Sequence, residues 1–289
     1  MLRKLLAPAG LLLMAGLFVL AAAPALAETT QAPLKEPSWS FSGPFGMYDQ
    51  AQLQRGFKVY TEVCSQCHSL NLIQFHNLGD PGGPFFNAKY PNPNENPVVK
   101  AVAAGWQRQV PDIDADTGDP IHRPATTADV PTPPFPNEPA ARASNGGALP
   151  PDMSLLVAAR EGGPNYVYSL ITSYAPTPAG VAAPPGKYYD PIFPGDLSST
   201  WTGKGDVPLG GFISMPPPLG ATDCKVTFDD GTPCTRDQEA KDIAAFLTWA
   251  SDPHMNERKQ MGLAVMVYLL IFTGLLYVSY RQVWRNVAH

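Results

Sequence analysis

The segment Cys64-Ser65-Gln66-Cys67-His68 constrains this chain more than any other part of its 289 residues. Cys-x-x-Cys-His is the attachment pattern of a c-type haem, in which two thiols reach the two vinyl groups of one porphyrin. The histidine that follows binds the iron as its proximal ligand. A thioredoxin-like dithiol would sit in a βαβ pattern, which this sequence lacks. The pattern occurs once, so we predict one haem c, bound covalently through Cys64 and Cys67 and ligated by His68.

Residues 1–27 have the composition of an export signal. Arg3 and Lys4 form a basic start, residues 5–20 are mainly apolar, and Ala25-Leu26-Ala27 offers a small-residue cleavage site. Haem is attached to c-type motifs on the outer side of the membrane, so export and motif agree. Removal of the signal takes away two basic residues and changes the formal charge from −5 to −7. This acidic balance excludes a general affinity for nucleic acid and favours a basic partner.

The other end of the chain carries a long uncharged run, because no charged residue occurs between Lys259 and Arg281. A helix over this run would be about 31 Å long, and the hydrocarbon core of a bilayer is about 30 Å thick. Basic residues flank the run on both sides, so its orientation follows from the export signal and not from charge. Three tyrosines supply aromatic anchors, namely Tyr268, Tyr277 and Tyr280.

These segments divide the chain into four predicted parts. They are a signal peptide over 1–27, a periplasmic c-type haem domain over 28–257, a transmembrane anchor over 258–281 and a cytoplasmic tail over 282–289. In a bacterium, the haem domain would lie on the periplasmic side of the inner membrane. The chain would cross the lipid bilayer once, with its C-terminus in the cytoplasm.

The haem domain is predicted to be mainly α, with a cytochrome c-like arrangement of short helices joined by long loops. The chain has 33 prolines and 25 glycines, and both residues interrupt regular structure. The stretch 107–139 is rich in proline, aspartate and threonine and has no apolar period. Its scattered apolar side chains favour a loop that packs on the domain over a disordered one.

Four short helices are predicted from capping residues and apolar periodicity. The first leads into the haem motif, and the fourth begins with a capping box formed by Thr235 and Gln238. In chain order, the residues that mark the start and end of each helix are Asp49 and Cys64, Asp152 and Gly162-Gly163, Tyr166 and Pro176, and Thr235 and Pro253.

The haem iron needs a sixth ligand, and topology removes most candidates. The histidines and methionines of the signal, anchor and tail lie elsewhere, and His76 is too close to the proximal histidine to reach the opposite face. Met215 is favoured because three prolines follow it. Proline fixes φ and has no N–H, so such a strap is stiff enough to hold a thioether over the haem. Met153 and His122 remain as alternatives.

Five further short segments follow the haem motif along the chain. The segments are Asn145-Gly146-Gly147-Ala148-Leu149-Pro150-Pro151-Asp152, Ala159-Arg160 with Gly162-Gly163, Asn165-Tyr166-Val167-Tyr168-Ser169-Leu170, Met215-Pro216-Pro217-Pro218 and Arg258-Lys259-Gln260-Met261-Gly262. From about residue 38 to the anchor, these segments and their order resemble the cytochrome c1 family, the haem subunits of the quinol–cytochrome c reductase or bc1 complex.

The resemblance implies further haem contacts besides the two axial ligands. Arg160 would reach a haem propionate, with Tyr166 beside it. Asn145 and the Pro150-Pro151 turn would line the haem edge. From the residues alone, Arg160 is also a favourable cation near a helix end, and Tyr166 is also an ordinary core residue.

A haem with both axial positions filled passes electrons and binds no substrate, and a methionine ligand raises its potential. The resemblance implies that a Rieske iron–sulfur protein reduces the haem and that a soluble or tethered cytochrome c accepts the electron. Cytochrome b would be a further membrane partner. The isolated chain would be a redox subunit and not an enzyme. The alternatives are a free-standing membrane-anchored c-type cytochrome and a membrane-anchored haem peroxidase-like enzyme.

Two cysteines lie outside the haem motif. Cys224 and Cys234 would be exported to an oxidising compartment, where disulfides persist. Asp230-Gly231 between them favours a tight reversal of the chain, and their spacing does not match a zinc knuckle. We predict a disulfide that stabilises the fold by about 2–3 kcal/mol on the chain-entropy estimate.

Overall fold

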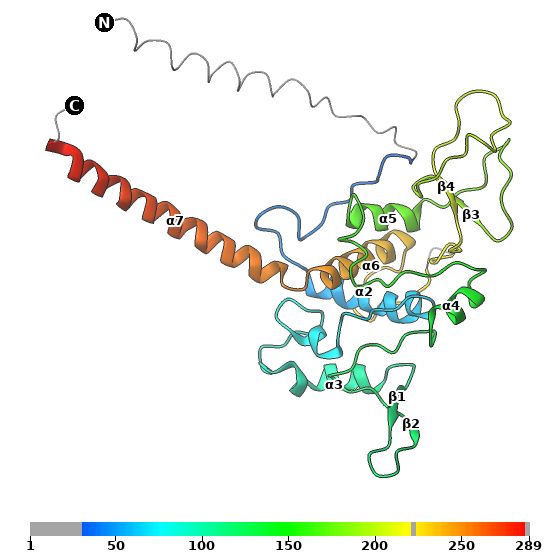
Figure 1. Cartoon of the computed structure of the whole chain (residues 1–289), viewed down its shortest axis with the longest axis horizontal. Coiled ribbons are helices and arrows are strands. Elements are labelled where there is room, and N and C mark those ends of the chain that lie inside the picture. Colours follow the sequence, from blue (N-terminus) through cyan, green and yellow to red (C-terminus); the bar gives the residue numbers. More distant parts are fainter. Residues whose placement is uncertain (1–30, 221–223, 287–289) are drawn as a thin grey trace, which may run out of the picture. The chain divides into compact units, whose positions relative to one another are not determined.

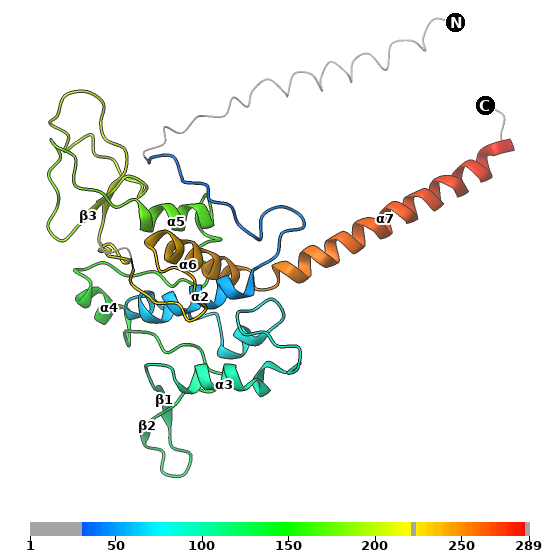
Figure 2. The same cartoon turned by 180° about the vertical axis from the view of Figure 1, so that it is seen from behind.

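The computed structural model describes residues 31–220 and 224–286, so the predicted signal peptide and the last residues of the predicted tail lie outside it. The described chain is mainly helical, as predicted, with long loops and two small antiparallel sheets (Figure 1, Figure 2). The α-helices are α2 Gln50–Glu62, α3 Pro97–Ala104, α4 Glu138–Ser144, α5 Pro164–Thr172, α6 Arg236–Ser251 and α7 Met255–Val283. The 3₁₀ helices are η1 Cys64–Gln66, η2 Phe75–Gly79, η3 Pro93–Glu95 and η4 Trp284–Asn286. Strand β1 Val110–Ile113 pairs with β2 Pro120–Arg123, and β3 Tyr188–Asp190 pairs with β4 Gly211–Ile213.

Helix α2 delivers the haem motif and begins as the sequence predicts. The Asp49 carboxylate accepts a hydrogen bond from the backbone N–H of Gln52 at 3.0 Å, which satisfies one of the free donors of the first turn. The apolar stripe of the helix is buried. The helix ends two residues before Cys64, and the motif itself continues in η1.

The centre of the core lies between α2 and α6. The rings of Phe57 and Tyr60 on α2 lie 5.6 and 5.9 Å from the ring of Phe246 on α6, measured between centroids. Gly56 allows the two backbones to approach closely, because a Cβ at this position would collide with the carbonyl of Asp242. The helix that carries the haem motif is therefore fixed along α6.

Helices α5 and α6 correspond to the third and fourth predicted helices. Thr235 accepts the backbone N–H of Gln238 at 3.1 Å, but the Gln238 side chain donates to Asp242, so only half of the capping box forms. Helix α6 ends before the proline, as expected. Helix α5 ends earlier than predicted, and Tyr174 lies beyond its last turn.

The prediction of a helix capped by Asp152 is wrong, because the chain from this residue to α5 forms turns. The Asp152 carboxylate is bound by the Ser69 hydroxyl at 2.7 Å and the Asn71 N–H at 2.8 Å, and these partners come from the segment after the haem motif. Gly162 and Gly163 both have positive φ, which separates the turns from α5.

The stretch 107–139 contains the β1–β2 hairpin, which the sequence did not predict. Arg123 joins its base through ion pairs to Asp112 at 2.5 Å and to Asp129 at 2.7 Å. Ile113 and Ile121 on the hairpin are 60% and 37% exposed. Part of this stretch therefore stands out from the domain instead of packing on it.

Helix α7 begins three residues before the predicted anchor and runs beyond its predicted end. Its apolar window has a mean hydropathy of 2.2 and is not buried by any described part of the chain, so the helix is long and apolar enough to cross a membrane. At its start, the Lys259 ammonium donates to the carbonyls of Phe41, Gly43 and Gly46 at 2.7, 2.8 and 2.9 Å. These bonds tie the beginning of α7 to the loop before α2.

Candidate haem-binding site

The haem motif forms a tight turn directly after α2. The backbone N–H groups of Cys67 and His68 both donate to the carbonyl of Cys64, at 3.1 and 2.9 Å. This turn places two thiols and one imidazole on a single short loop. Both cysteines are free thiols, Cys64 half-buried and Cys67 exposed, and burial raises the pKa of the Cys64 thiol to about 12. Neither sulfur is used in a disulfide, so both are available to form thioethers.

The imidazole of His68 is oriented by a single acceptor. Its Nδ1 lies 2.8 Å from the carbonyl oxygen of Pro151. A carbonyl can only accept, so Nδ1 carries the proton and Nε2 keeps its lone pair. Burial lowers the pKa of His68 against the opposing effects of Pro151 and Asp152. A neutral imidazole with an oriented second nitrogen is the form that ligates a metal. The donor set of this loop therefore fits a haem c.

Hydrogen bonds connect the segment after Pro151 with the segment after His68. Besides the bonds from Ser69 and Asn71, the Asp152 carboxylate accepts the N–H of Ser154 at 2.9 Å. Burial disfavours the charge of this carboxylate, but these hydrogen bonds outweigh burial and lower its pKa. Asp152 thus fixes the position of the proline that orients His68. The sequence pattern suggested a helix cap at this residue and missed its contribution to the site.

The backbone of His68 has its own partner. The hydroxyl of Tyr60, buried on α2, donates to the His68 carbonyl at 3.1 Å. Tyr60 belongs to the apolar stripe that predicts α2, and nothing in that stripe indicates a bond to the motif. The proximal histidine is therefore held at its imidazole by Pro151, which the resemblance placed near the haem, and at its backbone by Tyr60, which the sequence did not connect with the motif.

Met215 lies on a strap that is fixed on both sides. It follows β4, which pairs with β3, and its carbonyl accepts a hydrogen bond from the hydroxyl of Tyr174 at 3.0 Å. Ser214 is bonded to the ammonium of Lys187. Beyond the prolines, Leu219 is buried in the core. The strap is held in place, while the ligation of iron by Met215 stays a prediction.

Of the other predicted site residues, Arg160 and Tyr166 lie together, while Asn145 and Pro150 lie on the segment that leads to Pro151. Arg160 is exposed and lies against Tyr166, which is buried in the first turn of α5. Burial raises the pKa of the Tyr166 phenol, and the charge and hydrogen bond of Arg160 act in the opposite direction. Asn145 instead caps the end of α4, where its amide donates to the carbonyl of Ala141 at 2.7 Å. Pro150 lies next to the proline that orients the proximal histidine.

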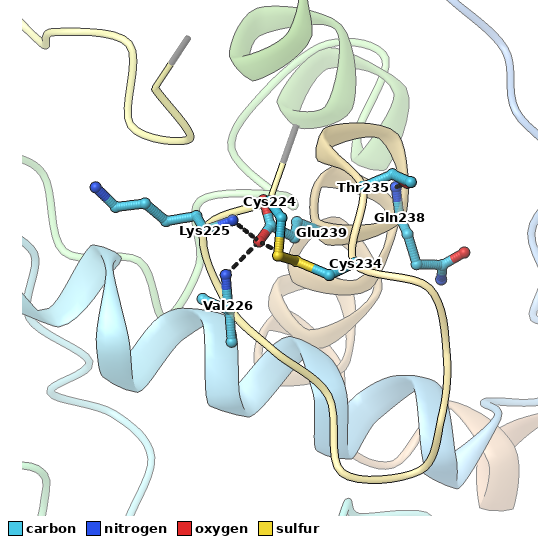
Figure 3. Close-up of a disulfide and its surroundings, with 7 residues drawn as sticks. All are labelled: Cys224, Lys225, Val226, Cys234, Thr235, Gln238 and Glu239. Carbon is cyan, nitrogen blue, oxygen red and sulfur yellow. Dashed lines mark hydrogen bonds between the residues drawn. A yellow bond between two sulfur atoms is a disulfide. The ribbon is translucent and has the colours of Figure 1, made fainter. Parts of the chain in front are cut away.

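The two remaining cysteines are joined by a disulfide with a Cα–Cα distance of 5.1 Å. Figure 3 shows Cys224 and Cys234 beside Glu239 of α6. The Glu239 carboxylate is fully buried and accepts the N–H groups of Lys225 and Val226 at 2.7 and 2.5 Å. The closed loop is therefore attached to the first turns of α6.

The same loop also contacts α2. Asp230 accepts from Arg55 of α2 at 2.7 Å, and Asp229 pairs with Lys58 at 2.9 Å. Arg55 reaches in addition to Asp242 on α6 at 2.8 Å. The disulfide loop thus contacts both α2, which precedes the haem motif, and α6.

A mainly helical domain with a Cys-x-x-Cys-His turn and a long apolar C-terminal helix defines a membrane-anchored protein of the cytochrome c class. A sequence profile described as the Cytochrome C1 family matches residues 39–287. Cytochrome c1 of Rhodospirillum rubrum is 38% identical over 294 residues, 96% of this chain and 97% of that protein. Cytochrome c1 of Blastochloris viridis is 38% identical over 268 residues, 86% of each chain.

A third relative is longer than this chain. The protein named cytochrome b/c1 in Bradyrhizobium diazoefficiens is 40% identical over 267 residues, which cover 86% of this chain but 35% of that protein. The chain belongs to the cytochrome c1 family, whose members are haem electron-transfer subunits of the bc1 complex. The predicted resemblance is confirmed, and membership favours neither the free-standing cytochrome nor the peroxidase-like enzyme.

Proposed function

We propose that this chain accepts electrons from a Rieske iron–sulfur protein and passes them, through one covalently bound haem c, to a cytochrome c. When bound, the haem supplies reversible one-electron exchange at its iron. The observation that carries the proposal is the 2.8 Å hydrogen bond between His68 Nδ1 and the Pro151 carbonyl, because it leaves Nε2 to ligate iron. The isolated chain is then a redox subunit, and catalysis belongs to the assembled complex.

The chain holds the group through four residues in this proposal. Cys64 and Cys67 would attach it through thioethers, and His68 and Met215 would bind its iron. The hydrogen bond from Tyr174 and the pairing of β3 with β4 hold the strap of Met215 in place. A preorganised strap supports the use of Met215 as a ligand.

The two alternative sixth ligands have less suitable positions. Met153 is buried, and its N–H donates to the Ser69 carbonyl at 2.9 Å, so it lies on the segment that orients the proximal histidine. His122 is exposed on β2. We assign Arg160 and Tyr166 to one haem propionate, since a guanidinium next to a phenol offers convergent donors to a carboxylate.

The proposed setting is the bacterial inner membrane. Helix α7 would cross it once, with the haem domain on the periplasmic side and the C-terminus in the cytoplasm. Cytochrome b and the Rieske protein would be its partners in the membrane complex, and Asn145 with the Pro150-Pro151 turn would line the haem edge.

Purification of the tagged chain from membranes in mild detergent tests this function. We expect haem that stays on the chain after denaturation, a low-spin ferric spectrum, and co-elution with a cytochrome b and an iron–sulfur protein. A high-spin ferric spectrum that changes with added ligands would support an enzyme instead. Elution without a cytochrome b would support a free-standing carrier.

A further inference from the structure

Three consecutive residues after α3, Trp106, Gln107 and Arg108, contact the haem motif from outside. We call this segment the clasp. The Gln107 amide donates to the carbonyl of Thr61 at 3.1 Å and accepts from Gln66 at 2.9 Å. Thr61 belongs to the last turn of α2, and Gln66 lies between the two motif cysteines. One side chain thus joins the end of the helix to the middle of the haem motif.

Arg108 holds the same turn through its guanidinium. Its Nη2 donates to the carbonyl of Ser65 at 3.0 Å and to the side-chain oxygen of Gln66 at 3.3 Å. Ser65 is buried, so its carbonyl has little access to water. A cation at the carbonyl end of a short helical turn is favourable. Both residues between the two motif cysteines are therefore bound by the clasp.

The clasp is itself anchored by its first residue. Trp106 is buried, and its ring stacks on Tyr60 with centroids 6.3 Å apart and planes inclined by 15°. Its indole N–H donates to the carbonyl of Thr132 at 3.3 Å. Tyr60 is the residue whose hydroxyl binds the His68 carbonyl. The clasp and the proximal histidine thus share one buried aromatic contact.

Within the described part of the chain, no carboxylate forms an ion pair with Arg108. Its Nη1 is buried and has no hydrogen-bond partner, and none of the ion pairs formed among residues 31–220 and 224–286 includes it. A guanidinium cannot lose its proton in a protein. A permanent positive charge on a half-buried side chain therefore lies beside the two residues between the haem-attachment cysteines.

We propose that Arg108 is a positioning residue that fixes the haem-attachment turn and, through its uncompensated charge, raises the reduction potential of the haem. This inference rests on the proposed function, because it requires haem at Cys64 and Cys67. Ferric haem carries one positive charge more than ferrous haem. A nearby fixed cation therefore disfavours the oxidised state, and the effect is larger where the charge is removed from water.

The test compares Arg108→Gln and Arg108→Lys in the detergent-solubilised complex by potentiometric titration of the haem. A unit charge about 10 Å from a redox centre, at an effective dielectric constant of about 20, changes an equilibrium ratio by roughly tenfold. At a fixed ambient potential, we therefore expect the reduced-to-oxidised ratio to fall about tenfold in R108Q, which corresponds to about 59 mV for one electron. R108K keeps the charge and should remain within about twofold of the wild-type ratio. Lys100→Gln removes an exposed charge from α3 and should leave the ratio unchanged.

A haem-loaded R108Q protein with the wild-type reduction potential would overturn the proposal. An R108K protein whose potential falls as far as that of R108Q would also overturn it. If R108Q fails to load haem, the potential of R108K decides, because a purely steric function would lower it. Failure of the proposed function has a different signature. In that case the wild-type chain itself would lack covalent haem or a low-spin spectrum, whatever residue stands at position 108.

Discussion

At the scale of single residues, the site depends on which atoms are already used. The hydrogen bond to Pro151 occupies Nδ1 of His68 and leaves Nε2 for the iron. On the Met215 strap, the bond from Tyr174 is accepted by the backbone carbonyl and does not involve the thioether. The imidazole of His68 and the backbone of Met215 are therefore both held through atoms other than the proposed ligating ones.

Replacement of Met215 by leucine tests the second ligand directly. Leucine keeps the volume and apolar character of the side chain, so the strap should still pack. Loss of the sulfur should leave the iron five-coordinate or open to foreign ligands. The potential should fall by roughly 0.1 V or more, since axial ligation sets potentials over a range of about 0.8 V. Optical spectra and potentiometry measure both effects.

Met153→Leu is the matched control for this variant, because Met153 is the other methionine of the domain considered as a ligand. It should keep the wild-type spectrum and potential. The opposite pattern, with an unchanged Met215→Leu protein and an altered Met153→Leu protein, would move the sixth ligand to the segment beside His68.

Asp152 should contribute stability in a pH-dependent way. Its hydrogen bonds to Ser69, Asn71 and Ser154 lower its pKa in the folded protein. A carboxyl with a lowered folded-state pKa contributes fully above its unfolded pKa of about 3.9 and loses that contribution as the pH falls through its folded value. Asp152→Asn should therefore cost about 1–2 kcal/mol at neutral pH and less near pH 3.

Unfolding of the haem-loaded protein at the two pH values, followed by haem absorbance, measures this difference. Asp116→Asn, in the exposed turn between β1 and β2, is the control and should have little effect at either pH. An equal loss at both pH values for Asp152→Asn would show that the shape of the side chain matters and its charge does not.

Residue-scale features were predictable from the sequence where the chemistry is local. The haem motif, the Asp49 cap and the Thr235 cap each involve residues within a few positions of one another, and the structure contains all three. Asp152 has the same local signature as a cap. Its partners Ser69 and Asn71 lie 83 and 81 positions away, and no local pattern reveals such a contact.

At the scale of elements, α2 and α6 depend on a shared buried charge. The side chain of Asp242 has no exposed surface, and Arg55 of α2 is 15% exposed and pairs with it at 2.8 Å. Burial raises the pKa of Asp242, and Arg55 acts against this shift. This ion pair therefore links α2, which leads into the haem motif, with α6.

Arg55→Met should destabilise the domain strongly, because it leaves Asp242 buried without its cation. Removal of one partner of a buried pair costs about 3–5 kcal/mol. The double variant Arg55→Met with Asp242→Leu should recover much of this loss, since apolar residues of similar size replace such pairs at little cost. Thermal unfolding of the haem-loaded proteins compares them, and a single variant as stable as wild type would show that the pair is dispensable.

The elements that the sequence predicted correctly are those with a local signal, which is a capping residue, an apolar stripe or a long apolar run. Helices α2, α5, α6 and α7 all have such signals. The β1–β2 hairpin does not, because Pro111 stands inside β1, Pro120 begins β2, and the side chains do not alternate clearly between apolar and polar. Its position depends on ion pairs of Arg123, which no periodicity predicts.

At the scale of the whole molecule, the order of the motifs along the sequence was more informative than any single predicted element. The order of short motifs, from the haem turn to the basic start of α7, indicated the family before any geometry was known, and family membership is confirmed. What the order could not give is the set of contacts between motifs. The clasp on the haem turn and the disulfide loop between α2 and α6 both join segments that are far apart in the chain.

The acidic charge of the chain leads to a prediction about its electron acceptor. The full sequence has a formal net charge of −5, and loss of the two basic residues of the signal makes it more negative. A basic cytochrome c should therefore be steered to the complex by long-range attraction. Its bimolecular rate of electron transfer should fall several-fold as ionic strength rises toward 0.1 M, where the Debye length shrinks to about 10 Å. Stopped-flow reduction of a soluble cytochrome c measures this rate. A small anionic oxidant is the control, because repulsion should make its rate rise with salt. Equal salt dependence of the two rates would show that the charge of this subunit does not select its partner.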